Sequence, residues 1–133
     1  MTRYLLDTNI ISDLVRNPAG QAKRRLQIVG DENVCTSIIV ASELRYGCAK
    51  KGSAKLEERV EHVLAIIPVL PLEAPIDAHY GSIRADLERR GQPIGHNDLL
   101  IAAHACTLGL TLVTANVSEF SRIEGLAVEN WLE

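Results

Sequence analysis

The sequence predicts an α/β fold in which helices cover both faces of a small central parallel sheet. Three observations support this. Short apolar runs typical of buried strands alternate with segments long enough to form helices. Gly, Pro and helix-capping residues separate the two kinds of segment. No internal repeat interrupts their order. The chain has 133 residues, 47% of them hydrophobic, enough for one buried core with no room for a second. We therefore expect residues 1–133 to form a single domain.

The first strand and helix are predicted near the N-terminus. Arg3–Leu6 is a short apolar run that ends at Asp7, as a buried strand would. Thr8 or Asn9 can cap a helix that continues to about Arg16, because their side chains accept hydrogen bonds from free N–H groups at a helix start. In that case the Asp7 carboxylate is left for another role.

Residues 17–70 continue the alternation, with Pro, Gly and Ser at the borders of the elements. We expect a turn at Asn17–Gly20, a helix through Ile28, a strand at Val34–Thr36, a helix from Ser37 to about Lys50, a helix from Gly52-Ser53 through Ile67, and a strand at Val69–Leu70. The last of these lies between two prolines, which cannot donate to a strand ladder, so it is a short strand at best.

Residues 75–133 add two helices and two strands. We expect a helix from Pro75 to Arg90 stopped by Gly91, an apolar helix capped by Asn97 that runs through Leu108 to Gly109, a strand at Leu110–Val113, and a last strand at Leu126–Val128. Ligands of open parallel sheets bind beyond the carboxyl ends of the strands. Functional side chains are therefore expected just after Leu6, Thr36 and Val113.

Two acidic residues near these strand ends have both a structural and a functional explanation. Asp7 directly follows the first strand, where an Asp commonly caps a helix. Glu43 lies on an apolar helix face, with Ile39 and Val40 at i−4 and i−3. An acid there must be ion-paired, protonated or bound to a cation. A buried ion pair is the structural alternative, and Arg45 is a poor partner because i+2 points to another face.

Two further acids fit the same pattern. Asp98 opens the apolar helix at its positive end, where the helix dipole stabilises a carboxylate, so a capping role explains it equally well. Glu119 follows the Leu110–Val113 strand, near Thr114 and Asn116, and alone would pass as a loop residue. Clustered carboxylates repel one another unless a divalent cation neutralises them, and oxygen-only ligands suit Mg²⁺ or Mn²⁺. Such a site hydrolyses phosphodiester bonds with a metal-activated water.

Four segments, taken in order, resemble the PIN-domain family, and the stretch from Gly95 to Trp131 resembles VapC toxins in particular. These segments are Leu5-Leu6-Asp7-Thr8-Asn9, Ala41-Ser42-Glu43-Leu44-Arg45-Tyr46-Gly47, Asn97-Asp98-Leu99-Leu100-Ile101-Ala102-Ala103-His104-Ala105, and Leu112-Val113-Thr114 with Asn116 and Glu119-Phe120. The resemblance covers essentially the whole chain. It implies a PIN-like three-layer α/β/α sandwich and a Mg²⁺-dependent endoribonuclease, the toxin of a VapBC-type toxin–antitoxin system.

The resemblance also implies roles for individual residues. By position, Asp7 and Asp98 are the metal ligands, and Glu43 completes the catalytic cluster as a further ligand or by bonding a metal-bound water. Glu119 is a fourth catalytic candidate. The supporting residues are Thr8, Asn9, Thr114 and Asn116. The implied partners are an RNA substrate, a second copy of the chain in a homodimer, and a VapB-type antitoxin that forms a larger complex and blocks the site with its C-terminal segment.

Two positions depart from the family pattern. Many relatives have Asp where this chain has Asn116, which leaves open whether Asn116 or Glu119 completes the site. His96 stands where relatives often have Pro, and is either an incidental loop residue or a contact for substrate phosphate.

Other functions are less well supported by the sequence. An Asp-nucleophile phosphatase built on Asp7 needs a second Asp where Asn9 stands, and a zinc hydrolase built on the four histidines has no HxxxH pair. A catalytically silent PIN-fold binding module would have lost one of the first three acids, and none is lost. A DNA nuclease of related fold would need additional clamping segments.

Charge and cysteine content limit the partners and the compartment. The net charge is −3, and residues 1–66 hold ten Lys/Arg and eight Asp/Glu whereas residues 67–133 hold four and nine. A uniformly basic nucleic-acid binder is excluded, but basic patches at Lys23–Arg25 and around Lys50-Lys51 remain. Cys35, Cys48 and Cys106 are typical of small buried hydrophobes in a reducing compartment, and no signal peptide or long apolar run is evident, so a cytoplasmic protein without membrane association is expected.

Overall fold

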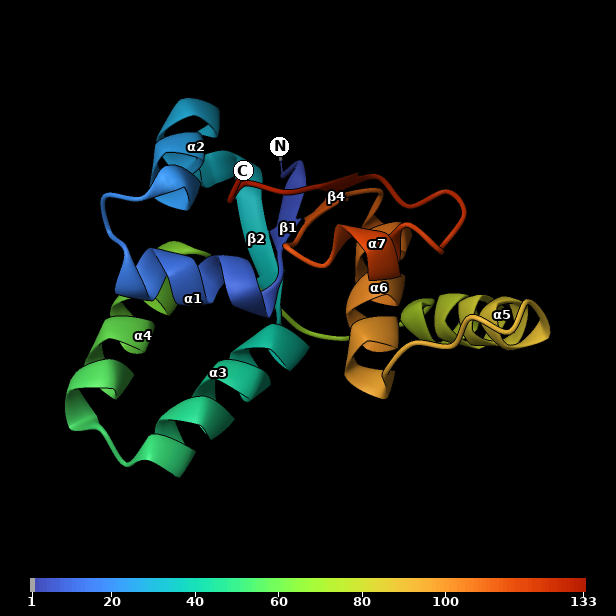
Figure 1. Cartoon of the computed structure of the whole chain (residues 1–133), viewed down its shortest axis with the longest axis horizontal. Coiled ribbons are helices and arrows are strands. Elements are labelled where there is room, and N and C mark those ends of the chain that lie inside the picture. Colours follow the sequence, from blue (N-terminus) through green and yellow to red (C-terminus); the bar gives the residue numbers. More distant parts are fainter. Residues whose placement is uncertain (1) are drawn as a thin grey trace.

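Five short strands form one parallel sheet in the computed structural model, which describes residues 2–133 (Figure 1). In chain order the elements are β1 (Tyr4–Leu6), α1 (Thr8–Arg16), α2 (Gln21–Val29), a 3₁₀ turn (Asp31–Asn33), β2 (Val34–Ser37), α3 (Ile38–Lys51), α4 (Ala54–Ile66), β3 (Val69–Leu70), α5 (Ile76–Arg89), α6 (His96–Leu108), β4 (Thr111–Val113), α7 (Val117–Phe120) and β5 (Val128–Glu129). The predicted α/β class with a small parallel sheet is confirmed.

The strand order, β3-β2-β1-β4-β5, determines where a site can form. From β1 the chain moves outward through β2 to β3, then returns past β1 to β4 and continues to β5. Because crossovers between parallel strands are right-handed, the outward run places α1 to α4 on one face and the return places α5 and α6 on the other. Figure 1 shows these two groups on opposite sides of β1 and β2. The chain leaves β1 toward β2 on one side and returns to β4 on the other, so the order of the strands reverses between β1 and β4. Ligands of parallel sheets bind at such a topological switch point.

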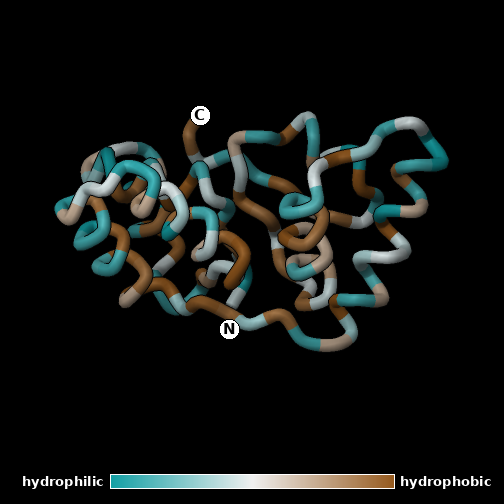
Figure 2. Tube along the Cα trace, turned by 90° about the horizontal axis from the view of Figure 1, so that it is seen from below, coloured by the Kyte–Doolittle hydropathy of each residue, from teal (hydrophilic) through white to brown (hydrophobic). Residues whose placement is uncertain are grey.

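The core is built from the strands and the helix faces that cover them. The side chains of Leu5, Leu6 and Leu112 in the two central strands are fully buried. Helix α6 buries its middle, Leu99 and Ile101–Ala105, as its apolar sequence predicts. In Figure 2 the apolar stretches lie along the interior segments and the hydrophilic ones along the outer turns. No helix within residues 2–133 is long and apolar enough to cross a membrane.

The cysteines behave largely as small hydrophobes. Cys35 and Cys48 are buried and Cys106 is partly buried, and within the described part of the chain all three are free thiols. Burial raises the pKa of the Cys35 thiol to about 11, so this group is protonated at neutral pH. The prediction of buried cysteines is confirmed for the first two.

Several predicted borders were wrong. Helix α1 is capped by Asp7 rather than by Thr8 or Asn9. Helix α6 begins at His96 after Gly95, so Asn97 lies inside the first turn instead of capping it. The backbone explains this, because the Leu99 N–H already donates to the Gly95 carbonyl at 2.9 Å.

Smaller differences occur at the ends of other elements. The last strand is Val128–Glu129, slightly later than expected, and the short helix α7 follows β4 where the sequence suggested only a polar loop. The Ser37 side chain caps α3 by accepting from the Ile39 N–H at 3.1 Å. Gly52 and Gly109 end α3 and α6 in the left-handed conformation, with φ values of 64° and 66°, which glycine adopts without a Cβ clash.

Candidate active site

Asp7 lies at the carboxyl end of β1, at the switch point of the sheet, and its side chain is only 3% exposed. Its Oδ1 accepts from the Thr8 N–H at 2.8 Å, and its Oδ2 accepts from the Thr114 hydroxyl at 2.7 Å. Burial raises the pKa of Asp7. These two hydrogen bonds lower it, and the charges of Glu43 and Glu119 raise it again. Asp7 is therefore not free of a capping role. Each carboxylate oxygen nevertheless has a second lone pair, so both can still accept from or bind another group.

The Thr8 side chain joins the start of α1 to α3. Its hydroxyl donates to the Glu43 Oε1 atom, a bond that spans 35 residues of sequence. This contact explains why Thr8 does not cap α1. Glu43 is half-buried, and it forms no ion pair within the described residues. Arg45 pairs with Glu61 instead, so the expectation that Arg45 is a poor partner for Glu43 is confirmed.

Thr114 connects the loops that follow β1 and β4. Its buried hydroxyl donates to Asp7 and accepts from the Asn116 N–H at 3.0 Å, with the Asn9 amide nitrogen at 3.5 Å. The Asn9 side-chain oxygen accepts from the Ala115 N–H at 2.9 Å, which explains why Asn9 does not cap α1. A hydroxyl has one proton and two acceptor sites, and all three are used here. Thr114 therefore fixes the orientation of Asp7 from the neighbouring strand.

Asp98 lies in the first turn of α6 and is half-buried. Burial, then a hydrogen bond and a charge interaction with Glu119, then the charges of Asp7 and Glu43, raise the pKa of Asp98 to about 7. The part of this shift that is not due to burial comes from Glu119, Asp7 and Glu43, which act on Asp98 only because they are close to it. The structure thus brings the four acids chosen from the sequence within electrostatic reach of one another.

Glu119 and Asn116 have different environments. The backbone turns helically after Asn116, because the Phe120 N–H donates to the Asn116 carbonyl at 3.2 Å and α7 begins at Val117. Glu119 lies in that first turn and interacts with Asp98. The Asn116 side chain is exposed and makes no capping bond, so within the described residues Asn116 contributes through its backbone N–H.

The donor set suits a hard divalent cation, because it consists of carboxylate oxygens, and the charges of neighbouring acids raise the pKa of Asp7 and of Asp98. Within residues 2–133 no three His, Cys, Asp or Glu side chains converge as a ready-made metal cluster. Mg²⁺ does not need one, because it keeps several waters and is commonly held by one or two carboxylates plus substrate phosphate. Asp98 and Asp7, whose charge raises the pKa of Asp98, are the two carboxylates that could meet that smaller requirement.

A buried polar pair beneath the site was not recognised in the sequence. His104 of α6 is 1% exposed, and its Nδ1 lies 2.9 Å from the hydroxyl of Ser37, the residue that caps α3. Burial lowers the pKa of His104, so its neutral form is favoured. The pair links the helix that carries Asp98 to the helix that carries Glu43. The available signal was a histidine within the otherwise apolar stretch Leu99–Cys106 of α6.

The other histidines lie in separate environments. His79 Nδ1 is 2.8 Å from the Thr107 hydroxyl. The exposed His96 has its Nδ1 3.2 Å from the Tyr80 hydroxyl and 3.5 Å from an Arg84 nitrogen. These contacts give no support to a shared zinc site. They place His96 beside a cation on α5, close to the start of α6.

Comparison with known proteins agrees with the geometry. The PIN domain family matches residues 4–126. The chain is 37% identical over 130 residues to Ribonuclease VapC2 of Rickettsia felis, covering 96% of this chain and 97% of that protein. It is 36% identical over 135 residues to the tRNA(fMet)-specific endonuclease VapC of Shigella flexneri, covering 98% and 99%.

A solved structure agrees as closely. The crystal structure of VapBC2 from Rickettsia felis bound to a promoter DNA fragment contains a chain that matches this one with a TM-score of 0.90 and 35% identity, over 98% of this chain and 99% of that one. The chain therefore belongs to the PIN-domain family, among the VapC-type ribonuclease toxins of VapBC toxin–antitoxin systems.

Proposed function

We propose that this chain is a Mg²⁺- or Mn²⁺-dependent endoribonuclease that hydrolyses RNA phosphodiester bonds at a site formed by Asp7, Glu43, Asp98 and Glu119. The same proposal treats residues 1–133 as one PIN domain. The observation that carries it is the placement of the four acids around the β1/β4 switch point, where burial together with Glu119, Asp7 and Glu43 raises the pKa of Asp98 to about 7. Without a cation such an arrangement is unfavourable, so it has a functional rather than a structural explanation.

The residues of the chain divide the work. Asp7, oriented by Thr8 and Thr114, and Asp98, held in the first turn of α6, would bind the cation between them. A bound divalent cation supplies charge to the phosphoryl oxygens and lowers the pKa of a water molecule. Glu43 accepts from Thr8 through Oε1, which leaves Oε2 free to take a proton from the attacking water. The positions of these carboxylates are fixed by four supporting residues, Thr8, Asn9, Thr114 and Asn116.

The proposed partners follow from the same relatives. Several of the related chains were solved in toxin–antitoxin complexes, among them VapBC from Salmonella typhimurium bound to DNA. We propose that this chain forms a homodimer and is inhibited by a VapB-type antitoxin in a larger complex. A basic side chain of that antitoxin, most simply Arg with its bidentate fork, would pair with the acids of the site. Expression of the chain alone should arrest growth, and co-expression of the antitoxin should relieve the arrest.

One experiment separates this function from its alternatives. Wild-type protein and Asp98→Asn are incubated with labelled RNA and with DNA, in Mg²⁺ or in chelator. We expect RNA cleavage by the wild type in Mg²⁺ only, and none by the variant. Asp77→Asn is the matched control, because Asp77 also lies in the first turn of a helix but is exposed.

The other outcomes identify what the protein does instead. Full RNA cleavage by Asp98→Asn would refute the site assignment. RNA binding without cleavage in Mg²⁺ would point to a catalytically silent binding module, and hydrolysis of phosphomonoesters alone would point to a phosphatase. Equal toxicity of wild type and Asp98→Asn would show that hydrolysis does not cause the growth arrest.

A further inference from the structure

A cavity of about 210 Å³ opens beside the acid cluster, between α1, α3 and α4. Figure 1 shows α1 and α3 diverging as they leave the sheet, with α4 across the space between them. Thr8 at the start of α1 and Glu43 within α3, which are hydrogen-bonded to each other, line the end of the cavity next to the site. Its walls are mainly apolar and comprise Val15, Leu44, Gly47, Cys48, Leu56 and Val60.

Two cations line the same cavity away from the acids. Arg16 is the last residue of α1 and Lys51 is the last residue of α3. Each lies eight residues beyond Thr8 or Glu43 on its helix, which is about 12 Å at a rise of about 1.5 Å per residue. Acidic and basic groups therefore lie in different parts of one cavity.

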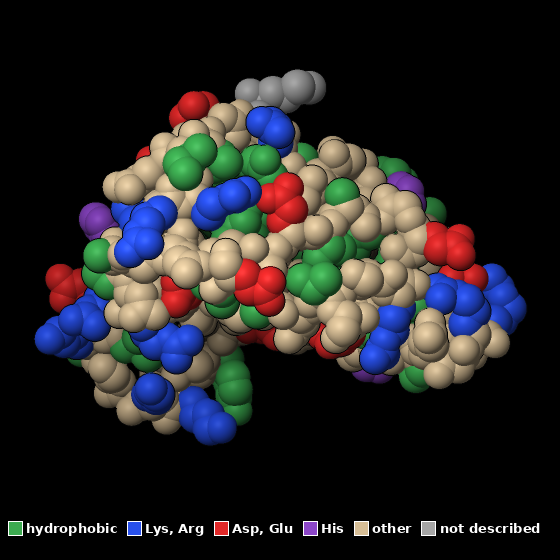
Figure 3. Space-filling view, turned by 45° about the horizontal axis from the view of Figure 1, so that its top comes forward, with side chains coloured by type: hydrophobic (Ala, Val, Ile, Leu, Met, Phe, Trp, Pro, Cys, Tyr) green, Lys and Arg blue, Asp and Glu red, His purple; other side chains and the backbone are tan. Residues whose placement is uncertain are grey.

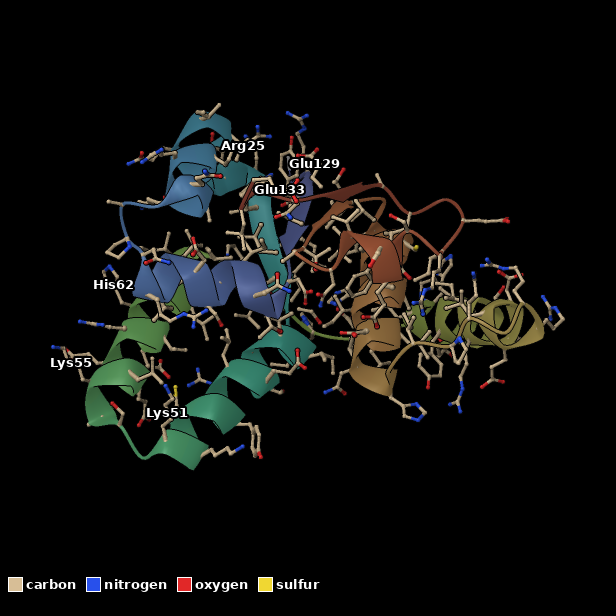
Figure 4. The ribbon with its side chains drawn as sticks, viewed as in Figure 1. Arg25, Lys51, Lys55, His62, Glu129 and Glu133 are labelled. Atoms are coloured by element: carbon tan, nitrogen blue, oxygen red, sulfur yellow. The ribbon has the colours of Figure 1, made fainter. Side chains whose placement is uncertain are left out.

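Neither cation forms an ion pair within residues 2–133. Arg16 donates only its Nε to the Ser12 carbonyl at 3.4 Å, which leaves its two terminal nitrogens available. Figure 4 shows Lys51 in the space between α3 and α4. In Figure 3 basic side chains are spread over the half of the molecule that contains α1 to α4, and a separate basic group lies at the opposite end. These cations are thus available to an anion from outside the chain.

A single strand of RNA matches this arrangement. Its phosphates would be repelled by four carboxylates unless nearby cations compensate, and cations beside an apolar wall attract phosphate more strongly than cations in open water. The separation of about 12 Å means that a phosphate bound by Arg16 or by Lys51 belongs to a nucleotide flanking the cleaved bond. Two cations in the same cavity therefore favour a polyanion as its occupant over a peptide that binds the acids through a basic side chain.

We propose that Arg16 and Lys51 form a phosphate-binding subsite that holds the RNA strand beside the cleaved bond, with the cavity between α1, α3 and α4 as its channel. This subsite rests on the proposed ribonuclease function and deepens it. The subsite acts by binding, so its loss should affect the capture of long substrates and leave the hydrolytic step almost unchanged.

The test compares Arg16→Gln, Lys51→Gln and the double variant with two matched controls. Lys50→Gln removes the neighbouring charge from the same helix end without touching the cavity, and Arg24→Gln removes an exposed charge from α2. The substrates are a fluorescein-labelled single-stranded RNA of mixed sequence and a dinucleotide too short to reach the subsite. Urea unfolding of every variant verifies that each is folded.

We expect the double variant to raise KM for the long RNA roughly tenfold while kcat stays within about twofold of wild type. Hydrolysis of the dinucleotide should not change. For the long RNA, the slope of log binding constant against log salt concentration should become shallower by about 1.4, because each lost phosphate contact contributes about 0.7. Each single variant should show about half of the change in log KM and about half of the change in salt slope. The two controls should match the wild type.

The failure of the subsite and the failure of the function are distinguishable. If the wild type cleaves RNA and the double variant retains the KM and salt slope of the controls, the subsite is refuted and the function stands. If those constants are unchanged but the double variant loses affinity for the antitoxin, the cavity holds the antitoxin rather than RNA. If the wild type cleaves no RNA in Mg²⁺, both proposals are wrong.

Discussion

Replacing Asp98 by Asn should remove activity and also make the metal-free protein more stable. The carboxyl of Asp98 has its pKa raised from an ordinary value of 3.8 to about 7 by burial and by the neighbouring acids Glu119, Asp7 and Glu43. An amide has nearly the same shape and carries no charge. The variant therefore keeps the packing at the start of α6 while it removes one of four mutually repelling groups.

The size and the sign of the effect follow from the pKa. The folded protein binds the Asp98 proton more tightly than the unfolded chain does, so wild-type stability falls as pH rises from about 4 to about 7. At about 1.4 kcal/mol per pH unit the ceiling is about 4 kcal/mol above pH 7. Asp98 is half-buried and shares its proton with Glu119, so solvent screening and coupling reduce this figure, and we expect about 1–2 kcal/mol.

Urea unfolding at pH 4.5 and pH 8, with EDTA or with Mg²⁺, measures the effect. In EDTA the variant should exceed the wild type at pH 8 by about 1–2 kcal/mol, and the difference should shrink toward zero at pH 4.5. Mg²⁺ binds the folded state, so it should stabilise the wild type more than the variant and narrow the gap at pH 8. The exposed control Asp77→Asn should show neither behaviour. An advantage that is equal at both pH values, or equal Mg²⁺ stabilisation of the two proteins, would refute the reasoning.

Four other substitutions test neighbouring parts of the site. Glu119→Gln should lower RNA cleavage substantially, with little loss of Mg²⁺ affinity by isothermal titration. Asn116→Ala should lower RNA cleavage less. If Asn116→Ala is inactive and Glu119→Gln has normal activity, the site has only three acids. Thr114→Val should destabilise the protein by about 1–3 kcal/mol in urea, because the Asp7 carboxylate loses a buried donor; an unchanged midpoint would contradict this. Burial lowers the pKa of His104, so the unfolded chain binds the His104 proton more tightly than the folded protein does. The wild type should therefore lose stability as pH falls below about 6.5. His104→Asn should not show this loss. Parallel pH profiles for wild type and variant would exclude that contribution.

The strands and helices could be predicted because their signals are local. A parallel strand buried on both faces appears as a short apolar run, and Gly or Ser at a helix end has a specific backbone or capping reason. Because these signals are local, they did not place every end of a helix or strand correctly. Asn97 is a better cap than Gly95 by side-chain chemistry, yet α6 starts at Gly95, whose carbonyl accepts from Leu99. The cap was decided by where the chain enters the helix, which composition does not reveal.

The acids were found from the sequence because the strands, and therefore the residues at their carboxyl ends, are predictable from the order of elements along the chain. The groups that donate hydrogen bonds to these acids were not found from the sequence. The Thr114–Asp7 bond spans 107 residues and the Thr8–Glu43 bond spans 35. The first contact depends on the pairing that brings β4 beside β1 and the second on the packing of α1 against α3, and no local pattern encodes either. The buried pair of His104 and Ser37 has the same origin, because it forms only once α6 packs against the end of β2.

Asp7 shows why a structural and a functional explanation of one residue need not compete. From the sequence, capping α1 and serving the site were weighed as alternatives for this carboxylate. In the structure one oxygen caps α1 and the other accepts from Thr114, and each keeps a lone pair for a cation. The cap fixes the carboxylate relative to α1 and the threonine fixes it relative to β4. A ligand held from two elements loses little freedom when a cation binds, so the capping bond supports the proposed metal site.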